Sequence, residues 1–322
     1  MDQVIAVVGP TAAGKSELAL RLAAELGGEI VNADSMQLYA GMDIGTAKLT
    51  PAQRRGIPHH LLDVWDVRYT ANVAEYQRLA RAVIDKIRSR GKVAVLAGGS
   101  GLYLRAALDT LDFPGTDPAV RQRLEEELAA GGPGPLHARL AAADPAAAAR
   151  ILPSNGRRIV RALEVIEVSG QPFTAALPSY ESVYPVVWLG LAVSRPELDR
   201  RIAVRTEQMF QAGLVAEVAG LARAGLREGR TASRALGYAQ VLRVLAGQWT
   251  QAHAQAQTVL STRRFARRQL AWFRRDPRVR WLPAEEADAA SLVKRTLSVC
   301  RAPSLAAAAV VASRPGEPGP GG

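Results

Sequence analysis

Short apolar runs alternate with amphipathic stretches in the first hundred residues. The runs cover residues 3–8, 29–33 and 93–97, and each is followed by a glycine or an aspartate. Between them, apolar residues recur at helical spacing over 15–26 and 73–90. Buried strands that alternate with amphipathic helices are typical of a parallel sheet covered by helices. The pattern therefore predicts an α/β fold with a parallel sheet core flanked by helices.

The pattern changes near residue 112, where strand signals stop. Helical stretches separated by Gly- and Pro-rich breaks follow over 118–130, 135–143, 145–152 and 155–169. A strand pattern returns at 186–193, and helical spacing resumes over 197–212, 214–224, 234–246 and 251–273. We predict a core of residues 1–112 and 186–302, a helical insertion at 113–185, and a disordered tail at 303–322, where Pro and Gly accumulate.

Composition excludes several protein classes. The chain has 322 residues, 48% of them apolar, and one cysteine, Cys300, so an intramolecular disulfide and a Cys-based zinc site are excluded. Four scattered histidines give no reason to expect a structural metal. No apolar run is long enough for a membrane helix, and residues 1–10 lack a basic leader, so we expect no membrane span and a cytoplasmic protein.

The positive charge is concentrated at one end of the chain. Residues 201–322 carry 19 basic and 8 acidic side chains, which equals the whole net charge of +11. Codon bias explains the excess of Arg over Lys but not this asymmetry. A one-sided basic region indicates a polyanionic partner, most often a nucleic acid.

A phosphate-binding loop lies between the first strand and the first helix. The segment Gly9, Pro10, Thr11, Ala12, Ala13, Gly14, Lys15 and Ser16 matches the pattern G-x-x-x-x-G-K-[ST]. Glycines let the backbone curl around an anion, while its N–H groups and the helix N-terminus supply positive potential. Lys15 adds a charge, and the Ser16 hydroxyl is placed to ligate Mg²⁺. The predicted core is therefore P-loop NTPase-like.

The loop alone does not identify the reaction. P-loop kinases usually place a carboxylate for Mg²⁺ at the end of another strand. Here the strand 93–97 ends in Gly98-Gly99-Ser100, and the nearest carboxylate is Asp34, after the strand 29–33. Ligands bind at this edge of parallel sheets, so Asp34 is either a metal ligand or a general base.

An ordered set of motifs resembles one family. After Gly9–Ser16 come Asp34–Tyr39, Gly41–Lys48, His59–Asp63, Gly98–Tyr103, Arg157–Glu164, and Arg201-Ile202 with Arg205. This set, spread over residues 3–282, resembles the bacterial tRNA dimethylallyltransferases, the MiaA type of the tRNA isopentenyltransferase family. Only the phosphate loop is shared with unrelated families, which makes the ordered set specific.

The resemblance implies a prenyltransferase that acts on RNA. The family moves the dimethylallyl group of dimethylallyl diphosphate to N6 of the adenosine 3′ of the anticodon, in tRNAs reading codons that start with U. It also implies that the helical insertion grips the anticodon stem-loop and that the protein is a monomer.

The same resemblance implies roles for the site residues. Lys15, the loop amides and Mg²⁺ at Ser16 would hold the diphosphate, and Arg205 would clamp it. Asp34 matches the family's general base, and Thr11 matches a loop threonine near the reacting groups. The target adenosine must leave the stacked loop to reach them. The positions that match tRNA-contacting ones are Asp34, Ser35, Met36, Gln37, Ser100 (where the family usually has Thr), Arg121, Arg157, Arg158, Ile159, Val160 and Arg161.

Structural alternatives stand beside these roles. Arg205 could instead form a structural ion pair with Glu207 or Glu217. Arg158 and Arg161 share a helical face, and that face could simply be exposed to solvent without contacting RNA. The segment Arg263–Trp281 holds eight arginines and four aromatic residues, which suits RNA phosphates and bases or an amphipathic helix. We interpret His59 and His60 as structural.

Two other functions fit part of the sequence. A small-molecule P-loop kinase accounts for the loop but not for the basic last third of the chain. A P-loop RNA-binding protein without catalysis accounts for both but predicts no covalent change in the RNA. The motif set favours the transferase.

Overall fold

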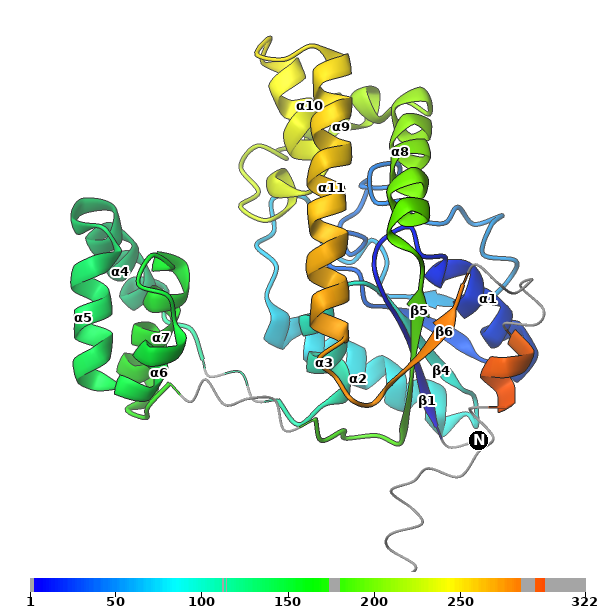
Figure 1. Ribbon diagram of the computed structural model, residues 1–322, viewed down its shortest axis with the longest axis horizontal. Helices are drawn as coiled ribbons and strands as arrows, with labels where there is room; N and C mark the ends of the chain where they lie inside the picture. The colour runs from blue at the N-terminus through cyan, green and yellow to red at the C-terminus, as the bar shows by residue number, and fades with distance from the viewer. Residues whose placement is uncertain (1–2, 112, 114, 174–179, 285–292, 299–322) are drawn as a thin grey trace, which may run out of the picture. The chain divides into compact units, whose positions relative to one another are not determined.

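Six parallel strands form a single sheet in the order β3-β2-β4-β1-β5-β6 (Figure 1). The structure is a computed structural model and describes residues 3–111, 113, 115–173, 180–284 and 293–298. The strands are β1 (Val4–Val8), β2 (Glu29–Asn32), β3 (His59–His60), β4 (Ala94–Ala97), β5 (Val186–Ala192) and β6 (Val279–Pro283). The predicted parallel sheet is confirmed. The tail predicted at 303–322 and Cys300 lie outside the described residues.

The helices mostly follow the predicted positions closely, but the one at Gly101–Leu108 was not predicted. They are α1 (Lys15–Leu26), α2 (Val73–Ser89), α3 (Gly101–Leu108), α4 (Pro118–Gly131), α5 (Pro133–Ala143), α6 (Pro145–Arg150), α7 (Gly156–Ser169), α8 (Arg195–Gln211), α9 (Leu214–Arg223), the 3₁₀ helix η1 (Ala232–Arg234), α10 (Tyr238–Leu245) and α11 (Gln251–Phe273). The helix predicted at 234–246 is divided between η1 and α10. Gly237, between them, has a φ of 88° that ordinary side chains avoid, so the chain turns there.

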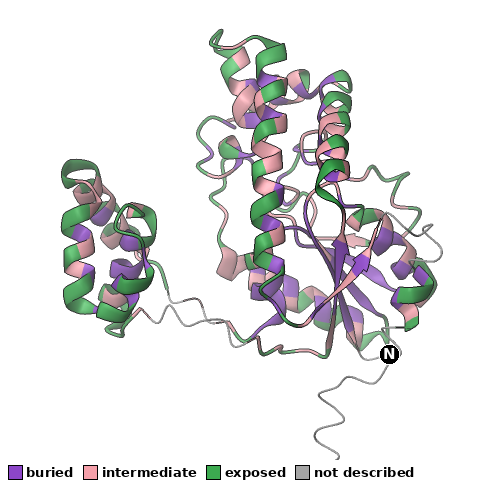
Figure 2. Cartoon of the chain, in the orientation of Figure 1, coloured by how far each residue is buried: buried purple, intermediate pink, exposed green. Residues whose placement is uncertain are grey.

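The central strand β1 is buried on both sides. Val4, Ala6 and Val8 join a core with α2 and α3, whereas Ile5 and Val7 join a core with α1 on the opposite face. Each face of the sheet is thus covered by helices, and β1, β2 and β4 are its most buried strands (Figure 2). Burial on both faces explains why the strands are continuously apolar instead of alternating.

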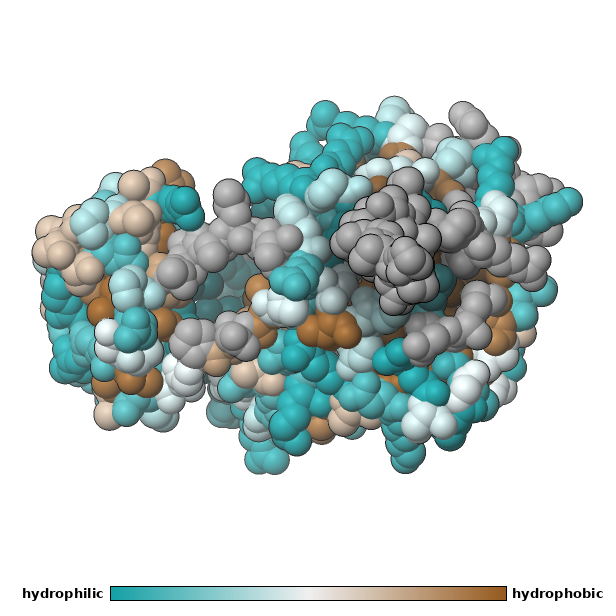
Figure 3. All heavy atoms as spheres, turned by 90° about the horizontal axis from the view of Figure 1, so that it is seen from below, coloured by the Kyte–Doolittle hydropathy of each residue, from teal (hydrophilic) through white to brown (hydrophobic). Residues whose placement is uncertain are grey.

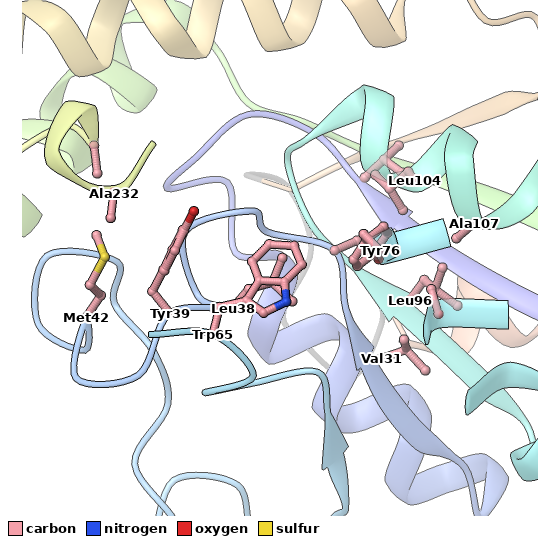
Figure 4. Packing of buried hydrophobic residues seen from close by; sticks show 14 of the residues in the cluster. Val31, Leu38, Tyr39, Met42, Trp65, Tyr76, Leu96, Leu104, Ala107 and Ala232 are labelled. Carbon is pink, nitrogen blue, oxygen red and sulfur yellow. The ribbon is translucent and has the colours of Figure 1, made fainter. Parts of the chain in front are cut away.

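The chain after β2 is anchored in the first of these cores. The rings of Tyr39 and Trp65 lie edge to face with centroids 5.8 Å apart, and Leu38 is fully buried beside them (Figure 4). Tyr76 of α2 donates its hydroxyl to the carbonyl of Asn32, the last residue of β2. The packing of Tyr39, Trp65 and Leu38, together with the hydrogen bond from Tyr76, therefore holds the segment that follows Asn32 in place.

Residues Thr110–Glu181 form a compact unit of their own, apart from the unit made by the rest of the chain. Helices α4–α7 build it around a separate core that includes Leu124, Leu140 and Leu163. The chain leaves the sheet unit at Asp109 and returns at Ser182, and these two residues pair as an antiparallel bridge. The Asp109 carboxylate, 1% exposed, binds both Arg105 and Arg278, which fixes this exit point.

Hydrophobic residues form only separate patches among hydrophilic ones on the face seen in Figure 3. Among the helices that the structure describes, none combines the length and apolar character needed to cross a membrane.

Candidate active site

The phosphate loop joins β1 to α1 as predicted. Gly9 has a φ of 138° and Gly14 a φ of 96°, and Gly14 is the N-cap of α1. A side chain at Gly9 would also press against the backbone of Leu191 in β5. The two glycines therefore permit a turn that directs the loop and the N-terminus of α1 toward the carboxyl edge of the sheet.

Lys15 lies folded back over this loop. Its ammonium group donates a hydrogen bond of 2.7 Å to the carbonyl oxygen of Pro10. Burial lowers the pKa of Lys15 to about 8; the Asp34 carboxylate raises it and the Arg205 guanidinium lowers it. Three charges from three distant segments thus act on one another at the loop.

Asp34 sits in a turn directly after β2. Its carboxylate accepts a hydrogen bond of 2.9 Å from the N–H of Met36. The side chain of Asn32 holds the Asp34 backbone on both sides: its oxygen accepts from the Asp34 N–H at 2.9 Å, and its amide donates to the Asp34 carbonyl at 3.0 Å. The carboxylate is therefore presented at the sheet edge by a fixed backbone.

Arg205 of α8 reaches the same place from the other half of the chain. Its guanidinium donates to the Thr11 hydroxyl at 3.3 Å and to the Thr46 carbonyl at 3.4 Å. Burial lowers the pKa of Arg205, and the Asp34 charge opposes that shift. Within the described residues no carboxylate pairs with Arg205, so its donors face the loop and not an internal ion pair.

The two acids considered as partners of Arg205 are engaged elsewhere. The Glu217 carboxylate accepts hydrogen bonds from the N–H groups of Asp43 and Ile44, at 3.2 and 2.7 Å, and from the Tyr238 hydroxyl at 2.5 Å. Glu207 accepts a bond from Gln211. The ion-pair alternative for Arg205 is therefore wrong, and Glu217 instead orders the loop that carries Thr46.

Two adjoining hollows open at these residues. A polar one of about 570 Å³ is lined by Lys15, Ser16, Asp34 and Arg205. The second, of about 330 Å³, shares Thr11, Asp34, Thr46, Arg205 and Met209 with the first; hydroxyl and arginine side chains also line it, but it is slightly the more apolar of the two. Its other apolar lining residues are Ala12, Met36, Ile202, Ala235, Leu236 and Phe265. Asp34 and Arg205 thus stand where an anion site meets an apolar pocket.

Ser35 and Met36, which follow Asp34, line this pocket as well, and Gln37 lines the polar hollow. Ser35 and Ser100 lie side by side, with the Ser100 hydroxyl 3.3 Å from that of Ser35. Gln37 donates its amide to the Thr46 carbonyl at 3.1 Å. Met36 packs partly on the core and partly lines the pocket. The structure therefore brings the predicted segments 34–37 and 98–100 together.

The predicted RNA-contacting residues of α4 and α7 divide into two groups. Arg121 and Arg161 both bind the fully buried Glu164, and they hold its pKa down although burial alone would raise it. Ile159 and Val160 are buried in the core of their unit. Arg157 and Arg158 are exposed, so in this stretch their side chains are the ones open to solvent.

The basic segment Arg263–Trp281 is partly structural and partly exposed. Arg278 is held by Asp109 and Asp276, and Phe273 is buried, so part of the segment is structural. Arg264, Arg267, Arg268, Arg274 and Arg275 are exposed, as is Trp272 at 45%. Arg268 and Phe265 also line the apolar pocket.

Gln269 is a site residue that the sequence pattern does not indicate. It is buried on α11, and its side chain contacts both the phosphate loop and Gly99. The signal in the sequence that could have indicated Gln269 is its position, because it is a polar residue on the buried side of an Arg-rich helix. His59 and His60 form β3, where the His59 ring donates a hydrogen bond to the Ile57 carbonyl and the His60 ring donates one to the buried Glu29 carboxylate. Within the described ranges no three His, Cys, Asp or Glu side chains gather as metal ligands would.

Comparisons with known proteins identify the family. The model of the IPP transferase family matches residues 37–276. The tRNA dimethylallyltransferase of Streptomyces coelicolor is 65% identical over 304 residues, covering 94% of this chain and 97% of the relative. The tRNA dimethylallyltransferase of Thermobifida fusca is 66% identical over 304 residues, covering 93% and 94%.

Solved structures show the same fold. The tRNA isopentenylpyrophosphate transferase of Bacillus halodurans is 37% identical, with a TM-score of 0.69 over 93% of this chain and 97% of that one. A eukaryotic dimethylallyltransferase acting on tRNA is 23% identical, with a TM-score of 0.81 over 98% and 81%, and supports the fold alone. The phosphate loop, the ordered carboxylate and the matches over nearly the whole chain show that this protein belongs to the IPP transferase family, the family of the tRNA dimethylallyltransferases.

Proposed function

We propose that this enzyme transfers the dimethylallyl group of dimethylallyl diphosphate to N6 of the adenosine 3′ of the anticodon, in tRNAs that read codons starting with U. The observation that carries the proposal is the placement of Asp34 and Arg205 at the junction of an anion site and an apolar pocket. The products are N6-isopentenyladenosine and diphosphate. A bond forms between N6 and the allylic carbon, and the bond from that carbon to the diphosphate oxygen breaks.

The polar hollow suits the diphosphate. Amides of the loop Gly9–Ser16, the N-terminus of α1, and the cations Lys15 and Arg205 all supply positive potential there. Negative charge grows on the diphosphate as it leaves, and groups already in place stabilise it without reorganising. The bidentate guanidinium of Arg205 fits two phosphate oxygens better than a point charge would.

The apolar pocket suits the five-carbon group. Met209, Leu236 and Phe265 would surround it and keep water from the allylic carbon, which gains positive character as the diphosphate departs. The pocket meets the polar hollow at Thr11 and Arg205, so a prenyl diphosphate can span both.

Asp34 suits the role of general base. The amino group of adenine is a weak nucleophile, and a carboxylate that accepts one of its protons assists attack. The adenine must be unstacked to reach Asp34. Ser35, Met36, Gln37 and Ser100, which line the two hollows, would then contact the extruded nucleotide. Arg121 and Arg157–Arg161 belong to the helical unit that we propose grips the anticodon stem-loop, with Arg157 and Arg158 on its surface.

Mg²⁺ fits the site only together with the diphosphate. The Ser16 hydroxyl lines the polar hollow, but the described residues offer no cluster of carboxylates to hold a metal alone. Mg²⁺ commonly binds through one protein oxygen, phosphate oxygens and water. Ser16 would hold the ion, which would neutralise charge on the leaving diphosphate. We propose that the enzyme acts as a monomer in the cytoplasm, where tRNA is available.

One assay tests the proposal. The protein is incubated with Mg²⁺, dimethylallyl diphosphate and an unmodified anticodon stem-loop that carries adenosines at and after the last anticodon position. The RNA is then weighed by mass spectrometry. A gain of one C5H8 unit on the adenosine 3′ of the anticodon is expected. ATP hydrolysis without change in the RNA would favour a kinase instead, and RNA binding without covalent change would favour a non-catalytic binder.

A further inference from the structure

Gln269 joins two loops of the active site through one buried side chain. Its oxygen accepts a hydrogen bond of 2.9 Å from the N–H of Thr11 in the phosphate loop. Its amide donates a hydrogen bond of 2.9 Å to the carbonyl of Gly99, in the loop after β4. The side chain is 6% exposed. Both ends of the amide are thus satisfied, each by a different loop.

The second of these loops leads directly to Asp34. A Cβ atom at Gly98 would collide with the carbonyl of Ala33, the residue before Asp34. Ser100, two residues after Gly98, accepts a hydrogen bond from the Ser35 N–H at 3.4 Å. The loop 98–100 therefore lies against the segment 33–35 on one side and against Gln269 on the other.

The glycines make this close packing possible. A Cβ at Gly99 would collide with the amide of Gln269, and one at Gly101 would collide with the indole of Trp272, one turn along α11. Helix α11 therefore reaches the backbone at two points, Gly99 in this loop and Gly101 at the start of α3. The side chain at 269 sits at the first of them, where it can transmit the position of the loop to Thr11.

We propose that Gln269 is a positioning residue that sets the spacing between the phosphate loop and Asp34. The inference rests on the proposed function: the loop holds the leaving diphosphate, and Asp34 holds the amino group that attacks. The amine and the diphosphate must lie on opposite sides of the allylic carbon, so their separation matters to the reaction. A displacement of about 1 Å between reacting groups costs on the order of 100-fold in rate.

The chemistry of the two contacts explains why an amide is needed. One partner is a donor and the other an acceptor, so the side chain must accept from Thr11 and donate to Gly99. Glutamate could accept but not donate, and its charge would face the Gly99 carbonyl. Methionine has a similar length and offers neither function, which leaves two buried backbone groups without a partner.

Two variants of the full-length protein test the role directly. Gln269→Glu removes the bond to Gly99, and Gln269→Met removes both bonds. We expect kcat for transfer to the stem-loop to fall by about 100-fold in Gln269→Met. The dissociation constant of the RNA should change less than about threefold, because Gln269 is buried and does not face RNA. In Gln269→Glu, binding of inorganic diphosphate should persist while kcat falls. The control Gln257→Met, a half-buried glutamine of the same helix outside both hollows, should keep the native kcat.

If Gln269→Met does not fold, Gln269→Glu still tests the inference, because it keeps the bond from Thr11. A double-mutant cycle gives an independent test. Gly99→Ala displaces the native amide, and Gln269→Ala removes it, so in the double variant the added methyl has room. If Gln269 acts through Gly99, the two effects on kcat are strongly non-additive. Additive effects, or a native kcat in both Gln269→Glu and Gln269→Met, would overturn the inference while the wild-type enzyme still transfers the prenyl group. Failure of the wild type to modify RNA would instead overturn the proposed function, and this inference with it.

Discussion

The guanidinium of Arg205 donates a hydrogen bond to the hydroxyl of Thr11, 194 positions away in the chain, at a distance of 3.3 Å. This hydrogen bond brings a cation from α8 to the second residue after the start of the phosphate loop. It also places Arg205 beside the Thr46 carbonyl, whose loop Glu217 orders. The anion site thus combines residues from the two chain segments of the sheet unit, one before and one after the helical unit. Each of its charged residues can be tested separately.

Asp34→Asn should slow transfer by about 100- to 10,000-fold, the usual contribution of a general base. Asparagine keeps an acceptor for the Met36 N–H, so the turn is retained and only the proton acceptor is lost. Single-turnover rates of RNA modification, measured with the RNA in complex, check this. A rate within threefold of native, with unchanged RNA affinity, would show that Asp34 is not the base.

Arg205→Lys should weaken binding of inorganic diphosphate by about 10-fold and slow transfer by more, because lysine keeps the charge but not the fork. The difference arises since charge on the diphosphate grows during the reaction. Titration calorimetry and steady-state kinetics separate the two effects. The matched control is Arg201→Lys on the same helix, where the guanidinium binds Glu197 and not the loop. Equal effects in both variants would exclude a specific role for Arg205.

Binding of inorganic diphosphate should weaken as the pH rises through about 8, the pKa of Lys15 in the free protein. The anion prefers the protonated ammonium, which is present below that pKa and absent above it. The affinity should therefore fall by about 10-fold for each pH unit above 8. Calorimetry between pH 7 and 9.5 measures this. Lys15→Arg stays charged, so its profile reports the titration of the diphosphate alone; identical profiles in the two proteins would contradict the prediction.

Removal of Arg157 and Arg158 should reduce the salt dependence of RNA binding. Both side chains are exposed on α7, and the slope of log affinity against log salt should fall by about 1 for each phosphate that is no longer neutralised. Filter binding of the stem-loop at several salt concentrations, with Arg157→Gln/Arg158→Gln, tests it. Arg123→Gln serves as the comparison, since Arg123 already binds Glu127 and Glu167. An unchanged slope in the double variant would place the RNA elsewhere.

Glu29→Gln should destabilise the sheet unit by up to roughly 3 kcal/mol at neutral pH. Burial would raise the pKa of Glu29, but hydrogen bonds from Lys92, His60 and Arg90 hold it at about 2. Because the folded pKa is depressed, this stabilisation is present above about 4.5 and is lost as the pH falls toward 2. Urea unfolding of both proteins at pH 7 and pH 3 checks the sign. The difference in the free energy of unfolding between the native protein and Glu29→Gln should be smaller at pH 3 than at pH 7. An equal difference at both pH values would refute the role of the charge.

Much of the fold was predictable because its signals are local. The strands near residues 4–8, 29–32, 94–97 and 186–192 are short apolar runs, the first three of them next to glycine or close to aspartate, and burial on both faces requires an apolar composition. Strand β3 has two residues, too few for any periodicity. Strand β6 contains Arg280 and Trp281 within an Arg-rich segment, so its pairing with β5 decides its conformation more than its own residues do.

The site divides in the same way. The phosphate loop is one continuous segment, and its glycines and Lys15 are recognisable without any other part of the chain. The contacts of Asn32 with Asp34, of Glu217 with the loop 43–45 and of Gln269 with Thr11 involve polar residues of ordinary appearance. Apart from the position of Gln269 on the buried side of its helix, little in their local sequence distinguishes them from surface residues, because each function arises from a partner that the fold supplies.

The sequence by itself determined the α/β class, the phosphate loop, the carboxylate after β2 and the family, since each depends on residues close together or on an ordered set of motifs. Only the tertiary structure decided that Arg205 faces the loop and not Glu217, that Ile159 and Val160 are buried, and that Gln269 bridges two loops. The physical reason is that packing of a sheet and its helices brings together backbone groups far apart in the chain, and a side chain's role follows from the groups it meets there.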